Sequence, residues 1–167
     1  MNDFERVVVK SFNNHFKKAG IRALSYRLKQ SRFFTQYLDV LVDSINPDLY
    51  LGIECKSISV EKGASALYFS QHFTVDKRGV HQIERISDYQ NSTGRRGFLA
   101  VELRHGTGKT RTAHLIPWND VERRYLDQSL KISIDEIRTY PEMKRSGSLY
   151  MVNIIENEHI HKIQSPL

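Results

Sequence analysis

The sequence predicts one α/β domain, because segments with helical periodicity alternate with β-rich apolar runs along its 167 residues. Apolar side chains recur every three or four positions near the N-terminus and again in the middle of the chain, and strand-like runs lie between and after them. The hydrophobic content of 40% is enough for one compact core, and no Pro/Gly/Ser-rich linker divides the chain. We therefore expect a single domain over residues 1–167.

The N-terminal part predicts a helix followed by three strands. The helix is expected over 4–19, because five apolar residues share one face: Phe4, Val8, Phe12, Phe16 and Ala19. Asn2 or Asp3 can cap this helix, and Gly20 can end it. Strands are predicted at three places, with the turn "SINPD" joining the last two: 23–28, 37–43 and 49–56.

The middle of the chain predicts a second helix and a β-hairpin. Residues 67–73 fit a short strand or an extended loop, and Thr74 or Asp76 can cap a helix that ends at "NSTGRRG". "GFLAVEL" and "TAHLIPW" are predicted strands joined by "RHGTGK". "GTGKT" is not a P-loop, because Leu103 stands at its first glycine and no helix follows, so we predict a turn in which Lys109 can touch a phosphate.

Two short helices are predicted near the C-terminus. The first begins at Asn119 or Asp120 and continues through Tyr125. The second follows a capping box made by Ser133 and Glu136. The segment over 149–155 fits a strand or a helix equally well.

Composition excludes several classes of protein. No apolar run approaches the roughly 20 residues of a membrane span, and no signal-peptide core is present, so we expect a soluble, cytoplasmic protein. The single cysteine, Cys55, excludes an internal disulfide and a Cys-based zinc cluster, so that any metal should have oxygen ligands. A net charge of +6 favours a polyanionic partner, although a merely solvated basic surface would give the same charge.

Two acids lie on segments that would otherwise be apolar strands. If Asn46 and Pro47 form the centre of a hairpin, Asp39 lies directly opposite Glu54. Lys56 shares a strand face with Glu54 because side chains alternate along a strand. The three charged groups are therefore expected to converge.

Such a cluster would destabilise the fold if its residues had only a structural role. Opposed like charges destabilise a strand pair unless a cation or Lys56 offsets them. Mg²⁺ suits the site, because it prefers oxygen and binds through one or two carboxylates plus substrate phosphates. Surface charges on an edge hairpin are the alternative interpretation.

The motif formed by "LD" at 38–39 and "ECK" at 54–56 resembles the PD-(D/E)xK nuclease superfamily. "FER", which contains Glu5, and "HQIERISDYQ", which contains Gln82, are similar to segments of archaeal Holliday junction resolvases, as is "AHLIPW". The sequence departs from this family at Leu38, in the longer segment 57–80, and in "RLKQSRFFTQ", which lacks the usual glycine. These departures leave nuclease chemistry intact and junction specificity open.

The resemblance implies a restriction-endonuclease-like fold, with a central mixed β-sheet flanked by helices, and metal-dependent phosphodiester hydrolysis. Asp39, Glu54 and the backbone carbonyl of Cys55 would hold Mg²⁺, for which Mn²⁺ can substitute, and Glu5 would act at a second site or through water. Lys56 would orient or activate the attacking water. Gln82 would position Lys56 or a backbone phosphate.

The resemblance also implies a homodimer that nicks branched DNA, recognised by shape and backbone charge. Candidate DNA contacts are dispersed along the chain: Arg27, Lys29, Ser31, Arg32, Lys62, Lys77, Arg78 and Lys109. We expect a nucleoid-associated protein with no membrane association and no small-molecule cofactor. A restriction- or repair-type endonuclease on duplex or flap DNA, and a non-cutting DNA-binding module, are the alternatives.

Overall fold

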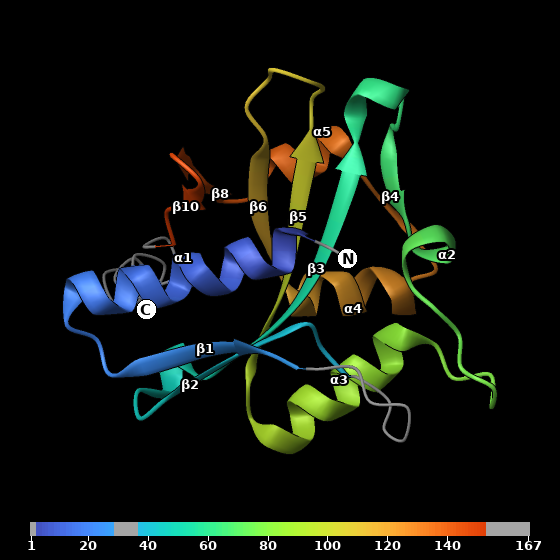
Figure 1. Cartoon of the computed structure of the whole chain (residues 1–167). Coiled ribbons are helices and arrows are strands. Elements are labelled where there is room, and N and C mark those ends of the chain that lie inside the picture. The colour runs from blue at the N-terminus through green and yellow to red at the C-terminus, as the bar shows by residue number, and fades with distance from the viewer. Residues whose placement is uncertain (1–2, 29–36, 153–167) are drawn as a thin grey trace, which may run out of the picture.

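The computed structural model of the chain describes residues 3–28 and 37–152 (Figure 1). Three of the predicted DNA contacts, Lys29, Ser31 and Arg32, lie outside the described residues, as do the Asn2 cap and the end of the predicted C-terminal segment. Within the part of the chain that is described, no helix has both the length and the apolar character needed to cross a bilayer.

A six-stranded mixed sheet forms the centre of the molecule, in the order β1-β2-β3-β5-β6-β8. Only β3 and β5 pair in parallel, and the other neighbours are antiparallel. The strands are β1 (Ala23–Arg27), β2 (Val40–Ser44), β3 (Leu51–Ser59), β5 (Arg96–Arg104), β6 (Thr112–Pro117) and β8 (Glu142–Met143). Four short strands form two small ladders: β4 (Ala66–Tyr68) with β7 (Lys131–Ser133), and β9 (Arg145–Ser146) with β10 (Leu149–Tyr150).

Helices cover both faces of this sheet (Figure 1). One face packs against α1 (Asp3–Ala19), and the other packs against α3 (Gln82–Thr93) and α4 (Trp118–Leu126). Two apolar clusters fill the space between the layers, and strand alternation separates them: Ile53 faces α1, whereas Leu99 faces α3 and α4. The predicted α/β class, with a central mixed sheet flanked by helices, is confirmed.

The first helix forms as its periodicity predicts. Phe4, Val8, Phe12 and Phe16 are buried against the sheet. Gly20 follows with φ of +66°, a left-handed conformation that glycine adopts without a steric cost, so the helix ends there.

The β2–β3 hairpin has the register that the sequence predicts. Val40 pairs with Ile53 and Val42 with Leu51, so continuing the ladder by one residue brings Asp39 to Glu54. The connection is longer than a tight turn, because a short 3₁₀ helix, η1 (Pro47–Leu49), follows the cap Asn46. The strand begins at Val40, so the prediction that it starts at residue 37 is wrong.

The predicted start of the second helix is also wrong. Its first residue is Gln82, and His81 is the cap, with its imidazole Nδ1 accepting from the backbone N–H of Ile83. Asp76 closes a loop instead, because its carboxylate accepts the backbone N–H groups of Arg78 and Val80, both at 2.9 Å. This local use of an aspartate competes with helix capping.

The remaining predictions are close to the structure. The segment over 67–73 divides between β4 and a short helix, α2 (Phe69–His72), and another 3₁₀ turn, η2 (Val60–Lys62), precedes them. The turn "RHGTGK" joins the antiparallel strands β5 and β6, as predicted. Helix α4 begins at Trp118, and the capping box of Ser133 and Glu136 starts α5 (Ile134–Thr139).

Candidate active site

Strand β3 places Glu54 and Lys56 on the sheet face that α3 covers. The ammonium Nζ of Lys56 lies 2.7 Å from Oε1 of Glu54, and the Glu54 residue is only 2% exposed. The same ammonium lies 4.8 Å from the ring centroid of Phe73, which gives it a cation–π contact. Cys55 points to the opposite face and is buried in the α1 cluster, so its side chain is a core residue.

Asp39 lies just before β2 and is held by backbone groups on both sides. Its carboxylate Oδ2 accepts the backbone N–H of Cys55 at 2.9 Å, and its carbonyl oxygen accepts the N–H of Leu28 at 3.2 Å. Burial, together with the nearby charge of Glu54, raises the pKa of Asp39 to about 7 against the opposing hydrogen bond from Cys55. The two carboxylates thus repel each other, as the hairpin register predicts.

Gln82, the first residue of α3, contacts the acid of the cluster. Its Nε2 donates to Oε1 of Glu54 at 2.9 Å, and its Oε1 accepts the backbone N–H of Thr74 at 3.2 Å. Burial raises the pKa of Glu54, while the charge of Lys56 and these hydrogen bonds oppose that shift. Gln82 therefore orients Glu54, whereas the sequence had suggested Lys56 or a phosphate as its target.

Glu5 reaches the cluster from the first turn of α1. It forms an ion pair with Arg27 of β1. The negative charge of Glu5 is one of the causes that raise the pKa of Asp39 and of Glu54, so the three acids share one electrostatic environment. Arg27 was predicted as a DNA contact, and the structure places its guanidinium beside this acid. No sequence pattern indicates that pairing, because it depends on how α1 crosses β1.

His72 is a neighbour of the cluster that sequence analysis did not identify. It ends α2 and is half-buried, and burial together with the charge of Lys56 lowers its pKa. The short helix brings His72 and the next residue, Phe73, close to the ammonium of Lys56. Neither residue has a motif that marks it in the sequence.

The donor set suits a hard cation that keeps most of its water. Among residues 3–28 and 37–152, no group of three or more His, Cys, Asp or Glu side chains is arranged to hold a metal ion. Asp39 and Glu54 supply two carboxylates; Lys56 contacts Glu54, and its charge also acts on Asp39. The raised pKa of each acid reflects buried negative charge that a divalent ion would offset. Mg²⁺ fits such a sparse set, because substrate phosphate and water complete its coordination.

The other predicted DNA contacts lie in two separate places. Lys77 and Arg78 are exposed on the loop that leads into Gln82, and Arg78 also lies 3.5 Å from Asp76. Lys62 and Lys109 lie on the far end of the sheet, in η2 and in the β5–β6 turn. The first pair therefore precedes the helix residue that bonds to Glu54, whereas the second pair lies at an end of the sheet.

No protein-family model matches the chain, and a comparison with curated proteins finds no match. Among solved structures, the chain is similar to Hjc, a Holliday junction resolvase of the archaeal hyperthermophile Archaeoglobus fulgidus. The two chains are 13% identical with a TM-score of 0.48, and the match covers 87% of this chain and 95% of that one.

Proposed function

We propose that this chain is a metal-dependent DNA endonuclease that hydrolyses phosphodiester bonds in four-way junctions. The observation that supports it most directly is the meeting of Asp39, Glu54 and Lys56 at the β2–β3 ladder, where the half-buried Asp39 lies opposite the buried Glu54. Such an arrangement costs stability as scaffold, because both acids are desolvated and repel each other. Phosphodiester hydrolysis uses this combination of carboxylates and an ammonium.

The contacts of each residue support a role for it in this proposal. Mg²⁺, or Mn²⁺ in its place, would be held by Asp39, Glu54 and the carbonyl of Cys55, with Glu5 at a second position or through water, and would supply Lewis-acid chemistry to water and phosphate. Gln82 and Lys56 both bond to Oε1 of Glu54, so Oε2 is the oxygen that can face a cation. Lys56 would then orient the attacking water, because its ammonium is fixed beside the carboxylate.

Branched DNA is the substrate that we propose. The resemblance of "FER", "LD…ECK" and "HQIERISDYQ" to junction resolvases supports it, together with the net charge of +6. A homodimer would present two sites to opposed strands of a junction. A restriction- or repair-type endonuclease is the alternative within the enzymes, and a non-cutting DNA-binding module is disfavoured because both acids and the lysine are present.

Glu54→Gln tests the catalytic proposal. The variant keeps an oxygen for Lys56 and Gln82 but loses the charge of a ligand, so cleavage with Mg²⁺ should fall by about 100-fold or more, while DNA binding in EDTA is kept or tightened. Glu61→Gln, at an exposed acid in η2, should cleave like the wild type. Parallel loss of binding and cleavage in folded Glu54→Gln would assign a structural role to Glu54.

Competition between DNA shapes tests the substrate. An unlabelled immobile junction should displace a labelled junction far better than linear duplex of equal length at the same salt, and nicks should fall in symmetric pairs near the branch point. If duplex competes equally and is cut at one short sequence, the restriction-type alternative is correct.

A further inference from the structure

The ammonium of Lys56 contacts an aromatic ring as well as a carboxylate. Its Nζ lies 2.7 Å from Oε1 of Glu54 and 4.8 Å from the centroid of the Phe73 ring, above the ring face. A cation in this position is attracted by the quadrupole of the ring, and the attraction is stronger where the pair is shielded from water. The side chain of Lys56 is only 16% exposed, so the ring is a second group that can fix this ammonium.

The ring of Phe73 is itself held in place by the core. It is buried, and it packs edge-on against Phe69 and Trp118, with ring centroids 5.5 Å and 6.3 Å away. The backbone N–H of Phe73 donates to the carbonyl of Phe69 at the end of α2, and the N–H of Phe69 donates to the carbonyl of Leu130, both at 2.9 Å. A ring that the core already orders loses little conformational freedom when it contacts the lysine.

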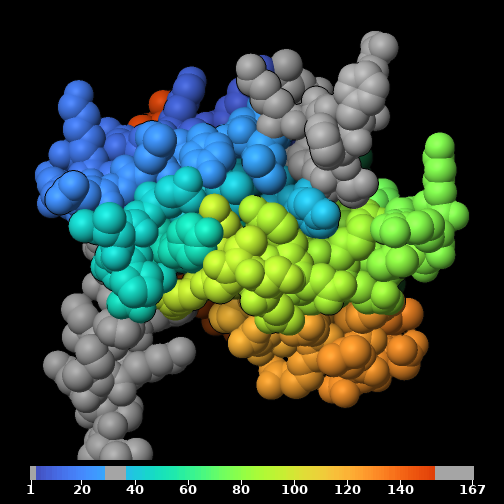
Figure 2. Space-filling view, turned by 90° about the horizontal axis from the view of Figure 1, so that it is seen from below, coloured from blue at the N-terminus to red at the C-terminus, as the bar shows by residue number. Residues whose placement is uncertain are grey.

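The residue after Phe73 holds the other partner of the ion pair through Gln82. The backbone N–H of Thr74 donates to Oε1 of Gln82 at 3.2 Å, and the carbonyl of Thr74 accepts the N–H of Gln82 at 2.7 Å. The amide of Gln82 then donates to Oε1 of Glu54 at 2.9 Å. The loop between Thr74 and Gln82 lies at the surface, in green beside α3 in Figure 2. Phe73 and Thr74 thus connect the end of α2 to both Lys56 and Glu54.

Core packing alone does not account for this arrangement. Phe73 belongs to the apolar cluster that α3 and α4 cover, and packing explains why its ring is buried there. A charged group placed against an apolar residue loses hydration, which is unfavourable unless the two groups attract each other. Phe73 also lies in the segment 57–80, one of the places at which the sequence departs from the family that it resembles. The contact is therefore a feature of this chain that its motifs do not indicate.

We propose that Phe73 is a positioning residue, whose ring holds the ammonium of Lys56 beside Glu54 and so preorganises the lysine to orient the attacking water. Preorganised charge contributes to a reaction because the site does not have to rearrange as the transition state forms. The effect of Phe73 on cleavage rests on the proposed function. Its effect on the position of Lys56 does not, so the two are measured separately.

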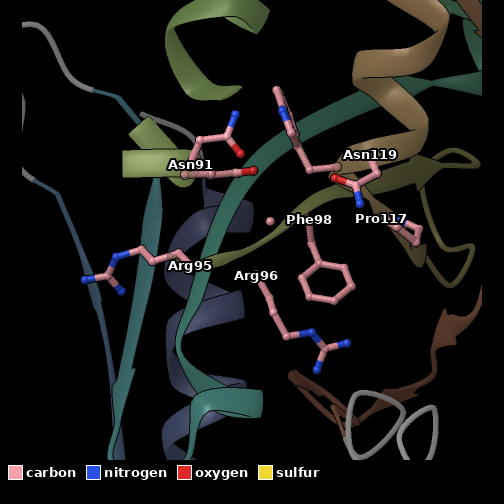
Figure 3. A pocket seen from close by; sticks show the side chains of 9 residues that line it. Asn91, Arg95, Arg96, Phe98, Pro117 and Asn119 are labelled. Atoms are coloured by element: carbon pink, nitrogen blue, oxygen red, sulfur yellow. The ribbon is translucent and has the colours of Figure 1, made fainter. Parts of the chain in front are cut away.

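Truncation of Phe73 would not test this role, because it would also remove packing from the core. Trp118, which packs on Phe73, also lines a pocket of about 290 Å³ that has Asn91 and Asn119 on opposite sides (Figure 3). A cavity beside this pocket would destabilise the core and let it rearrange. Replacing Phe73 by mono-, di- and trifluorophenylalanine nearly keeps the shape of the ring, while each fluorine weakens the negative face that attracts the ammonium.

The mobility of Lys56 is measured first, by carbon relaxation in NMR on the metal-free protein. The signal of its ε-methylene group is the one that Lys56→Met lacks, and its order parameter should fall stepwise as fluorines are added to Phe73. The same series at Phe69 is the matched control, because this ring is equally buried and makes no cation–π contact with any residue that the structure describes. An order parameter that trifluorination of Phe73 leaves unchanged overturns the proposal.

Cleavage of junction DNA with Mg²⁺ is measured second. The kcat should fall stepwise, by about fivefold in the protein with trifluorinated Phe73, while KM and DNA binding in EDTA stay at their wild-type values. The Phe69 series should cleave like the wild type. An equal loss of kcat in both series, or a more mobile Lys56 with an unchanged kcat, overturns the positioning role. A wild-type protein that cuts no DNA contradicts the nuclease proposal instead, and the order parameters still decide whether Phe73 fixes Lys56.

Discussion

At the scale of a single residue, Asp39 makes the stability of the metal-free protein depend on pH. Burial, followed by the charge of Glu54, raises its pKa to about 7 from about 4 in an unfolded chain. The folded state therefore holds this proton more tightly, and the stability present below pH 4 is lost as pH rises through 7. The loss should amount to roughly 2–4 kcal/mol.

Asp39→Asn tests this prediction, because the amide oxygen still accepts the N–H of Cys55 but cannot ionise. Urea unfolding in EDTA measures the free energy of unfolding at pH 5 and at pH 8. The difference between these two free energies should be smaller for Asp39→Asn than for the wild type, and the variant should be the more stable protein at pH 8. Asp88→Asn, at an exposed acid of α3, should keep the wild-type difference. Equal differences in all three proteins would show that Asp39 is not desolvated as described.

At the scale of an element, the free edge of β1 is closed by a side chain of α1. β1 is the terminal strand of the sheet, and the amide of Asn13 donates to the carbonyl of Ser25 and accepts its N–H, both at 2.8 Å. This amide occupies the positions that a neighbouring strand would take, and an unpaired edge is a template for association. Helix and strand are thereby joined beside Arg27, which pairs with Glu5.

Asn13→Ala should destabilise the protein by about 1–3 kcal/mol, because both backbone groups of Ser25 lose their partner. Urea unfolding measures this loss, and light scattering at rising protein concentration should show more association than in the wild type. Asn14→Ala, one residue along the same helix, should change neither the stability of the protein nor its tendency to associate. If Asn13→Ala is as stable and as monodisperse as Asn14→Ala, water or a flanking group satisfies the edge.

At the scale of the whole molecule, the position of a pair of basic residues should affect DNA binding more than the charge that the pair carries. Lys77 and Arg78 are exposed on the loop that leads into Gln82, which bonds to Glu54. Lys17 and Lys18 are exposed in the last turn of α1, at the opposite end of the helix from Glu5. Phosphate contacts release counterions, so only a pair that touches DNA changes the salt dependence of binding.

The double variant Lys77→Ala/Arg78→Ala should therefore weaken DNA binding in EDTA and reduce the log–log salt slope by about 2. Lys17→Ala/Lys18→Ala removes the same charge and should leave the slope near that of the wild type. Equal changes in both proteins would mean that net charge alone drives binding, as the solvated-surface interpretation of the composition predicts.

The features that can be predicted from the sequence are those whose physical cause is local. The stripe formed by Phe4, Val8 and Phe12 defines a helix, and Gly20 ends it, because both effects act within a few residues. The hairpin register follows from the turn, since neighbouring antiparallel strands pair in order around it. Asp39 opposite Glu54, with Lys56 on the same face, could therefore be predicted before any tertiary contact was known.

Contacts between segments that are distant in the chain depend on the tertiary structure and could not be predicted from the sequence. Gln82 bonds to Glu54 because α3 crosses the face of β3, and this long-range contact prevails over the local signal that would start the helix at Thr74 or Asp76. Arg27 meets Glu5 only where α1 passes over β1, and Trp118 of α4 donates to Ser87 of α3 only where these two helices pack together. Periodicity reports which face of an element is buried, but the partner that covers this face is set by the packing of all elements together.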